Sequence, residues 1–476
     1  MQVQMWGVGT KSSSPAITAQ RRINMYVDVR KEQDKTSFAL IGRPGLTQFA
    51  NISASRTRGV WAVNSLSTPV LFVVQNNIVY SVNNAGIYVS IGTIGTYDSD
   101  VTMVDDGRYL VLVDGVNGYY YNMLTPAGLI KITDGNFSTS PDYVTWQDTY
   151  FIVVSSATNQ FQLSNNNDPS TWPAINIGAT QSIPGGLQAA IGDHAVLNVF
   201  GSYGAEFWQD TGAPDFPYAL IPGSAQEFGL TSPQSLAKFD NSLVGLFQNK
   251  MGALNVSRLQ GFSLRRLSNE DIEQLLADNK GATITADAYA VQWAGHPMYV
   301  MTLESANLTL AYDGATGIWS ELQGYGKQFS GYKYSTFVTR QIVGSFTDGK
   351  LYYYDNNSYM DGTDPVVREV WSKHIWNENK YIGISWLQVD VESGTGTVTG
   401  AGNSITPALD LQVSKDGGNS FQSVGYSTIG QIGDYTKRVF WSSLGAARDW
   451  VLKLRITDPN KIVITNAVAE MTGAPF

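Results

Sequence analysis

One pattern recurs seven times between Leu71 and Asp355, and it constrains the fold more than any single residue does. Each copy has an apolar run rich in β-forming residues, a short polar turn, and a second run that ends in aromatic residues or in Asn and Asp. This is the pattern of a β-hairpin. The spacings between equivalent residues are 39, 41, 44, 48, 56 and 43, taken from Phe72, Val111, Ile152, Val196, Val244, Val300 and Val343. An interval of about 40 to 50 residues, with several short strands per unit, predicts the blades of a β-propeller.

The predicted fold is all-β: a propeller of six or seven blades, a C-terminal β-sandwich and one short inserted helix. The last segment of the chain has apolar residues at every second position, as in Leu387, Val389 and Val391, so one face of each strand is expected to be buried. The predicted parts are an N-terminal segment that contributes closing strands (1–58), the propeller (59–355), a linker with some order (356–380) and the sandwich (381–476).

The longest interval of the repeat, between Val244 and Val300, contains the clearest helical segment. We predict that Ser268 caps its N-terminus and that Lys280 and Gly281 end it. Its apolar stripe consists of Ile272, Leu275 and Leu276. A lone helix on a β-rich body favours a packing role over a catalytic one.

Composition excludes several classes of protein. The chain of 476 residues has no cysteine, which rules out disulfides and thiolate metal sites. Charged residues make up 15%, and the net charge is -9, so tight binding to phosphate backbones is not expected. The N-terminus lacks the pattern of a secretory signal, and nowhere do 18 apolar residues follow one another, so we expect a soluble protein. A polar surface with few charges suits large permanent contacts.

The residues that catalysis needs do not form a recognisable constellation. The three histidines, His194, His296 and His374, are far apart in the sequence, which argues against a zinc site or a catalytic triad. Asp105 and Asp106 fit a turn, and Glu270 and Asp271 fit the start of the helix, so neither pair predicts a glycosidase. The polar run from Asp355 to Asp364 lacks the closing Glu of a calcium loop. We therefore expect no catalytic, cofactor-binding or metal-binding residues, no cofactor and no enzymatic activity.

Two further motifs have structural interpretations. Residues 414–421 resemble the Asp-box turn of sialidases, in which Asp416 would cap the turn and Phe421 would anchor it in the core. The tyrosine triplets 119–121 and 352–354 are compatible with a carbohydrate-stacking platform. Their position at the ends of hairpins favours packing instead.

Several stretches together resemble the packaged-DNA stabilisation proteins, or tail hubs, of short-tailed bacteriophages. The resemblance begins at Asn24-Met25-Tyr26-Val27 with Arg43-Pro44-Gly45-Leu46, and continues at 204–208, 211–213 and 310–313 with Trp319. It ends with Ser414-Lys415-Asp416-Gly417, 438–441, 444–445 and 452–455 in the last strands. It covers nearly the whole chain, and the order and spacing of the motifs carry it.

The resemblance implies a structural virion protein assembled in the host cytoplasm as a ring, most simply a homohexamer. Its expected partners are a portal adaptor, a tailspike or fibre, a tail needle or plug, and double-stranded DNA that passes without sequence-specific binding. No membrane anchor is expected. The alternative function is a carbohydrate-binding or sialidase-like propeller that recognises host glycans. A ring with a central channel favours the first function, and a stable monomer that binds sugar favours the second.

Overall fold

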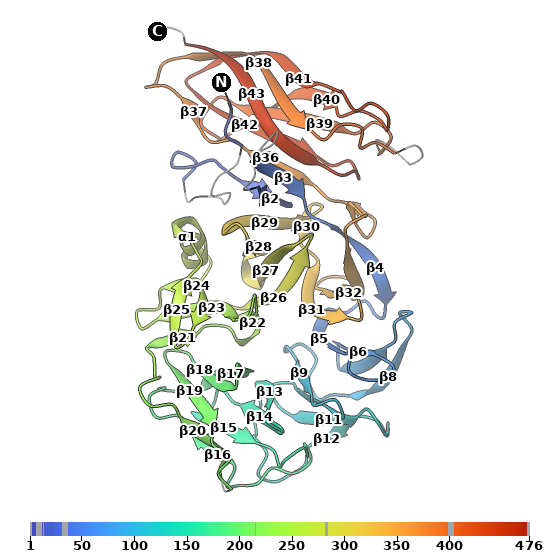
Figure 1. Cartoon of the computed structure of the whole chain (residues 1–476), viewed down its shortest axis with the longest axis vertical. Coiled ribbons are helices and arrows are strands. Elements are labelled where there is room, and N and C mark those ends of the chain that lie inside the picture. The colour runs from blue at the N-terminus through green and yellow to red at the C-terminus, as the bar shows by residue number, and fades with distance from the viewer. Residues whose placement is uncertain are drawn as a thin grey trace.

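The structure is a computed structural model that describes residues 2–5, 12, 14–30, 37–214, 216–280, 284–397 and 404–473. These residues form a β-propeller with a β-sandwich at one side of it, and both chain ends lie at the sandwich (Figure 1). The described elements are almost all strands. The exceptions are α1 (Glu270–Asp278) and two short 3-10 helices, η1 (Pro233–Ser235) and η2 (Glu304–Ala306).

Each of the seven predicted hairpins forms two neighbouring antiparallel strands of one sheet. The propeller therefore has seven blades, and the predicted fold class is confirmed. Blades 1 and 2 contain β5 (Thr57–Val63), β6 (Val70–Gln75), β7 (Ile78–Val82) and β8 (Tyr88–Thr93), then β9 (Thr102–Asp105), β10 (Tyr109–Val113), β11 (Gly118–Asn122) and β12 (Ile130–Lys131). Blades 3 and 4 contain β13 (Tyr143–Gln147), β14 (Tyr150–Val154), β15 (Gln160–Leu163) and β16 (Ile177–Ala179), then β17 (Leu187–Asp193), β18 (Val196–Gly201), β19 (Ala205–Asp210) and β20 (Tyr218–Leu220).

The last three blades carry extra strands. Blade 5 contains β21 (Phe228–Leu230), β22 (Ala237–Lys238), β23 (Leu243–Asn249), β24 (Leu254–Gln260) and β25 (Ser263–Arg266). Blade 6 contains β26 (Ala286–Trp293), β27 (His296–Leu303), β28 (Leu308–Asp313) and β29 (Ile318–Gly324), with β30 (Lys327–Gln328) beside β29. Blade 7 contains β31 (Gly331–Phe337), β32 (Arg340–Ser345) and β33 (Lys350–Asp355), followed by β4 (Gly45–Asn51), β34 (Met360–Asp361) and β35 (Asp364–Pro365).

The ring is closed by strands from both ends of the repeat region. β4, which precedes blade 1 in the sequence, pairs antiparallel with β33 of blade 7. A buried apolar cluster joins the same two blades, with Val60 and Leu71 from blade 1 and Phe337 and Ile342 from blade 7. Similar clusters fill the space between the other neighbouring blades. Closure of this kind removes the free ends that an open array would expose.

The sandwich has two sheets with a shared apolar core. One sheet contains β2 (Met25–Val29), β3 (Phe38–Gly42), β43 (Val463–Gly473), β38 (Ile382–Val391) and β41 (Val439–Ala447). The other contains β1 (Arg22–Ile23), β36 (Arg368–Trp371), β42 (Asp449–Ile456), β39 (Ala408–Ser414) and β40 (Gln422–Thr428), with β37 (Ile375–Trp376) beside β42. The N-terminal strands β1, β2 and β3 thus belong to sheets of the sandwich, which the sequence did not indicate.

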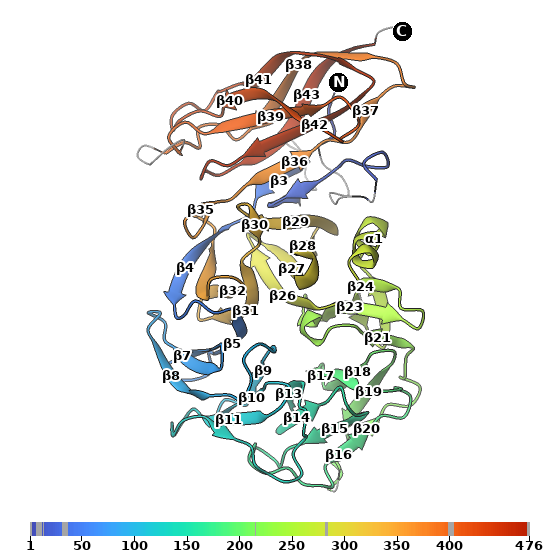
Figure 2. The same ribbon diagram turned by 180° about the vertical axis from the view of Figure 1, so that it is seen from behind.

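The propeller and the sandwich share one continuous sheet. β1 pairs in parallel with β29 of blade 6 and antiparallel with β36, which pairs with β42 of the sandwich. Residues 356–380, which we expected to be a linker with some order, hold four strands, and two of these join the sheets of the sandwich. Figure 2 shows β3 and β36 on the side of the sandwich that faces blade 6. Backbone hydrogen bonds across this junction favour a stiff connection.

The helix begins one residue later than predicted. Asn269, not Ser268, is the N-cap, and its Oδ1 accepts a hydrogen bond from the Ile272 backbone amide at 2.9 Å. The Ser268 hydroxyl is engaged with Val256 N and Glu273 instead. Ile272 and Leu276 are buried against blades 5 and 6, so the predicted packing face is confirmed.

Candidate functional site

Seven inner strands surround the centre of the propeller: β5, β9, β13, β17, β22, β26 and β31 (Figure 1). Four blades place charged residues at the beginning of these strands. Arg56 precedes β5, Asp100 precedes β9, Asp287 lies in β26, and Lys333 lies in β31. Because the inner strands lie side by side around one axis, these side chains meet at the same end of it.

Ion pairs connect the four residues with Glu304, which follows β27. Arg56 lies 2.8 Å from Asp100 and 3.2 Å from Glu304, and Lys333 lies 3.2 Å from Asp100. Lys333 also pairs directly with Asp287. We call these five residues the axial ion network. It joins blades 1, 2, 6 and 7 and therefore spans the junction at which the ring closes.

The interior of the axial ion network is screened from water. Asp287 is 4% exposed and Lys333 is 7% exposed. Burial raises the pKa of Asp287 to about 7. Burial alone would also raise the pKa of Asp100, but Lys333 and Arg56 hold it below its usual value. In the same way Asp100 and Asp287 outweigh burial and raise the pKa of Lys333.

The geometry of the network indicates a structural role. Every carboxylate in it has a cation partner, and the Tyr332 hydroxyl lies within hydrogen-bond distance of Glu304 and, at 3.2 Å, of Asp100. Asp287 and Lys333 are buried and already pair with each other, which favours a structural role over contact with a substrate. The network thus holds neighbouring blades together. Separation of the blades would leave a buried charge without its partner, which strongly destabilises a fold.

The three histidines lie in separate parts of the molecule, and each contacts a carboxylate. The distances from Nδ1 to the carboxylate oxygen are 2.9 Å for His194 to Asp193, 2.9 Å for His296 to Asp313 and 2.8 Å for His374 to Asp449. The bond to Asp313 raises the pKa of His296. In the part of the chain that the structure describes, no group of three or more His, Asp or Glu residues is suited to hold a metal ion.

The carboxylate pairs have the structural positions that the sequence indicated. Asp106 Oδ1 accepts hydrogen bonds from two backbone amides of its own turn, and Glu270 and Asp271 lie in the first turn of α1. The carboxylates of the polar run from Asp355 to Asp364 point to different partners. Asp361 pairs with Arg43 at 2.5 Å, Asp364 pairs with Lys327 at 2.7 Å, and Asp355 accepts from Thr47 at 3.2 Å.

The Asp-box segment forms the predicted turn. Asp416 accepts hydrogen bonds from Ser414 Oγ, Asn419 N and Ser420 N and Oγ, at 2.6 to 3.1 Å. These bonds lower the pKa of Asp416 to about 2. Phe421 is only half-buried and packs on Trp371, with ring centroids 4.6 Å apart, so it contacts the sheet without entering the core.

The tyrosine triplets are packing residues for the most part. Tyr119, Tyr121 and Tyr352 are buried in cores between blades. Tyr354 shares a hydrogen bond of 2.8 Å with Tyr289. A stacking platform for sugars would need exposed ring faces, which these four side chains do not offer.

The two N-terminal motifs meet at the junction of the propeller and the sandwich. Asn24 has a φ of 55°, a left-handed conformation that Asn tolerates better than most residues. Its Oδ1 accepts from Arg43 Nε at 2.9 Å and Gln323 N at 3.0 Å, and its Nδ2 donates to Gln323 O and Val367 O. Sequence motifs 19 residues apart thus form one buried contact between both parts of the molecule.

Comparison with protein-family models identifies both parts. Residues 1–359 match the model described as bacteriophage P22 Gp10, beta-propeller, and residues 367–472 match bacteriophage P22 Gp10, beta-sandwich. The chain belongs to the bacteriophage P22 Gp10 family. This is the tail hub and stabilisation family of short-tailed phages, so the chain is a structural phage tail protein and a virion component that contacts other virion proteins. The resemblance noted in the sequence is confirmed.

The comparison with solved structures gives matches of low similarity. Among solved structures, a virginiamycin B lyase from Staphylococcus aureus and the WD40 propeller domain of Doa1 are each 11% identical, with a TM-score of 0.42. They cover 66% of this chain, and 98% and 97% of their own chains. The Neurospora crassa Pan2 WD40 domain is 9% identical, covers 66% and 97%, and has a TM-score of 0.41. No curated protein sequence matches the chain. No helix among the described residues is long and apolar enough to cross a membrane.

Proposed function

We propose that this member of the P22 Gp10 family is the hub of a short tail, in which a ring of copies, most simply six, extends the portal-adaptor channel and retains packaged DNA. It offers attachment sites for tailspikes or fibres and for a tail needle or plug, and it assembles in the host cytoplasm without catalysing a reaction. The family match over both parts of the chain carries this proposal.

The charge of the propeller supports a passage through which DNA can slide. Residues 45–361 hold 26 Asp and Glu against 14 Lys and Arg. An acidic wall repels phosphates and lets DNA slide without tight binding.

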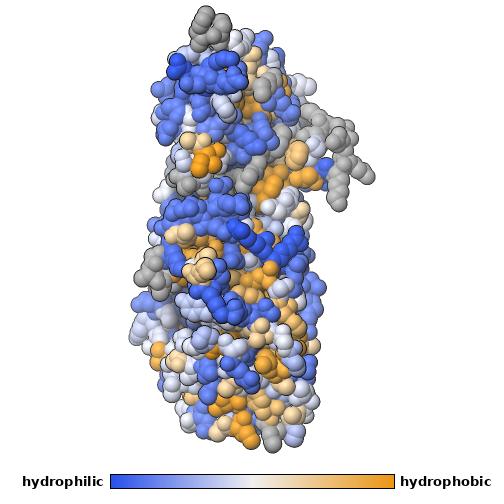
Figure 3. Space-filling model, turned by 90° about the vertical axis from the view of Figure 1, so that its left-hand side faces the viewer, coloured by the Kyte–Doolittle hydropathy of each residue, from blue (hydrophilic) through white to orange (hydrophobic). Residues whose placement is uncertain are grey.

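Exposed apolar edges support permanent contacts. β8 and β12 are the outer strands of blades 1 and 2, and they expose Tyr88 by 41%, Val89 by 62% and Ile130 by 40%. The amide of Leu129 donates to Ile91 O, which brings the two outer edges side by side. Uncovered apolar edge strands are an aggregation hazard, so such edges favour a covering partner. On another side of the molecule, Figure 3 also shows hydrophobic residues at the propeller surface among hydrophilic ones.

The oligomeric state of the purified chain with its portal adaptor tests this proposal. Native mass spectrometry and electron microscopy are expected to give a ring with a central passage. Val89→Lys is expected to weaken assembly, because it places a charge in the apolar edge. Lys250→Met, a change at an exposed ion pair, is the control that should assemble normally. A chain that stays monomeric with the adaptor present would contradict the proposal.

A further inference from the structure

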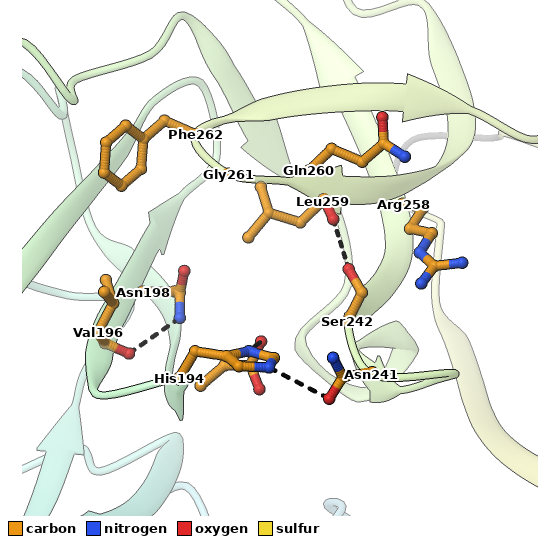
Figure 4. A pocket seen from close by; sticks show the side chains of 11 residues that line it. His194, Val196, Asn198, Asn241, Ser242, Arg258, Leu259, Gln260, Gly261 and Phe262 are labelled. Atoms are coloured by element: carbon orange, nitrogen blue, oxygen red, sulfur yellow. Dashed lines mark hydrogen bonds and ion pairs between the residues drawn. The ribbon is translucent and has the colours of Figure 1, made fainter.

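A cavity of about 350 Å³ opens between blades 4 and 5. Its floor comes from two turns between inner and second strands, with His194 in blade 4 and Asn241 in blade 5 (Figure 4). Its upper wall is the turn between β24 and β25, with Leu259 and Phe262. This volume is in the range of sites that hold small molecules.

Each charged group around the cavity already has a partner. His194 Nδ1 lies 2.9 Å from Asp193, and Arg258 Nη1 lies 3.0 Å from Asp240. Asp193 and Arg258 are therefore already engaged and are not free to pair with a charged ligand. A neutral ligand suits this cavity better than an anion or a metal cation does.

Two amide side chains have hydrogen-bonding atoms left over for a ligand. Asn198 is 3% exposed, and its Nδ2 donates to Ile191 O at 3.0 Å and Val196 O at 3.1 Å. These two bonds turn Asn198 Oδ1 toward the cavity (Figure 4), and no described residue donates to it. Asn241 Oδ1 is engaged by His194 Nε2 at 3.1 Å, which leaves Asn241 Nδ2 as a donor. The cavity thus offers one fixed acceptor and one donor.

An aromatic wall completes the site. Phe262 is 37% exposed, and its ring is held by Phe207, with centroids 4.8 Å apart. Leu259 and Val196 add apolar surface. A rigid aromatic face beside a few fixed polar groups suits a ligand that has both hydroxyl groups and an apolar C–H face.

We propose that this cavity binds a neutral hexopyranose unit of a glycan, with the sugar ring against Phe262 and its hydroxyl groups on Asn198 and Asn241. A peptide strand fits less well, because strand addition needs an open sheet edge. β18, β23 and β24, which supply the walls, each already have a strand on both sides. The inference concerns a site of the single chain and does not depend on the proposed ring.

Saturation-transfer NMR on the full chain with methyl glycosides of glucose, galactose, mannose and rhamnose tests the site. Millimolar binding of at least one glycoside is expected. Phe262→Ala and Asn241→Ala are each expected to weaken it about tenfold, which corresponds to about 1.4 kcal/mol. Tyr203→Ala is the matched control, because Tyr203 is an aromatic residue of blade 4 with 45% exposure that does not line the cavity.

Two results would overturn the inference. One is the absence of saturation transfer from every glycoside at millimolar concentration. The other is binding that Tyr203→Ala weakens as much as Phe262→Ala does, or binding of unstructured peptides in place of sugars. Because the measurement uses the isolated chain, a failure here leaves the ring proposal untouched, since that proposal is tested with the portal adaptor present.

Discussion

Replacement of Lys333 by Met tests whether the axial ion network holds the closed ring together. Met has a similar length and fills the same space, so the main loss is the cation beside Asp287, which is 4% exposed. Removal of one partner from a buried ion pair costs about 3–5 kcal/mol. Asp100 still has Arg56 at 2.8 Å, whereas Lys333 is the one cation among the described residues that pairs with Asp287. We expect a loss of about 3–5 kcal/mol at pH 8.

The loss should depend on pH in a defined direction. Burial already raises the pKa of Asp287 to about 7, and without Lys333 it should rise further. An acid whose pKa is higher in the folded state gains folding stability from protonation, and this gain is lost as the pH rises through the folded pKa. In the variant, protonation of Asp287 at low pH relieves the uncompensated charge. The difference between wild type and variant is thus expected to be smaller at pH 5.5 than at pH 8.

Urea unfolding followed by tryptophan fluorescence at the two pH values measures both effects. Lys350→Met is the control, because Lys350 lies 3.5 Å from Asp348 and both side chains are more than a third exposed. It should cost less than about 1 kcal/mol. The double variant Lys333→Met with Asp287→Leu should recover most of the loss. A Lys333→Met variant within about 1 kcal/mol of wild type at both pH values would refute this account of the ring closure.

Three further outcomes are expected. Gly186→Ala should lower the urea midpoint and reduce the free energy of unfolding by roughly 1–3 kcal/mol, because the added Cβ would lie 1.6 Å from Ser156 O. An unchanged midpoint would contradict this contact between blades 3 and 4. Asp416→Asn should lower the free energy of unfolding by about 1 kcal/mol at neutral pH. Since the pKa of Asp416 is about 2, the free energies of unfolding of wild type and variant should become equal as the pH falls from about 4 toward 2. Arg43→Met should lower the free energy of unfolding by about 3–5 kcal/mol, because buried Asp361 loses its cation partner. It should also speed proteolysis between propeller and sandwich. An unchanged cleavage rate would show that this pair does not hold the junction.

The sequence indicated the parts of the fold that depend on neighbouring residues. The seven hairpins follow from local alternation and turns, as in the pairing of Val73 with Tyr80 across two turn residues. The Asp-box turn is local too. In contrast, the pairing of β3 with β43 joins residues more than 400 positions apart, and no periodicity predicts which distant strands pair. Tertiary contacts also determine that Asn269 and not Ser268 is the N-cap, because the Ser268 hydroxyl is hydrogen-bonded to Val256 and Glu273.

The axial ion network was missed for a similar reason. Its members are isolated charges in four different blades, so no spacing connects them. A usable signal does exist, because each of Arg56, Asp100, Asp287 and Lys333 lies at the start of the first strand of its repeat. In an alignment of the repeats by strand position, these four charged residues occupy nearly equivalent positions. That equivalence predicts that their side chains lie close together around the axis.

The junction explains why a tail protein of this kind has its two N-terminal motifs so close to each other in space. A propeller that hinged freely on its sandwich would have few buried contacts across the junction. Here β1 extends the sheet of blade 6 into the sandwich, and Asn24 connects Arg43 with the backbone of Gln323 and Val367. Rotation at the junction would break these buried hydrogen bonds together, and each unsatisfied group costs about 1–3 kcal/mol. These buried contacts therefore hold the propeller and the sandwich in one arrangement.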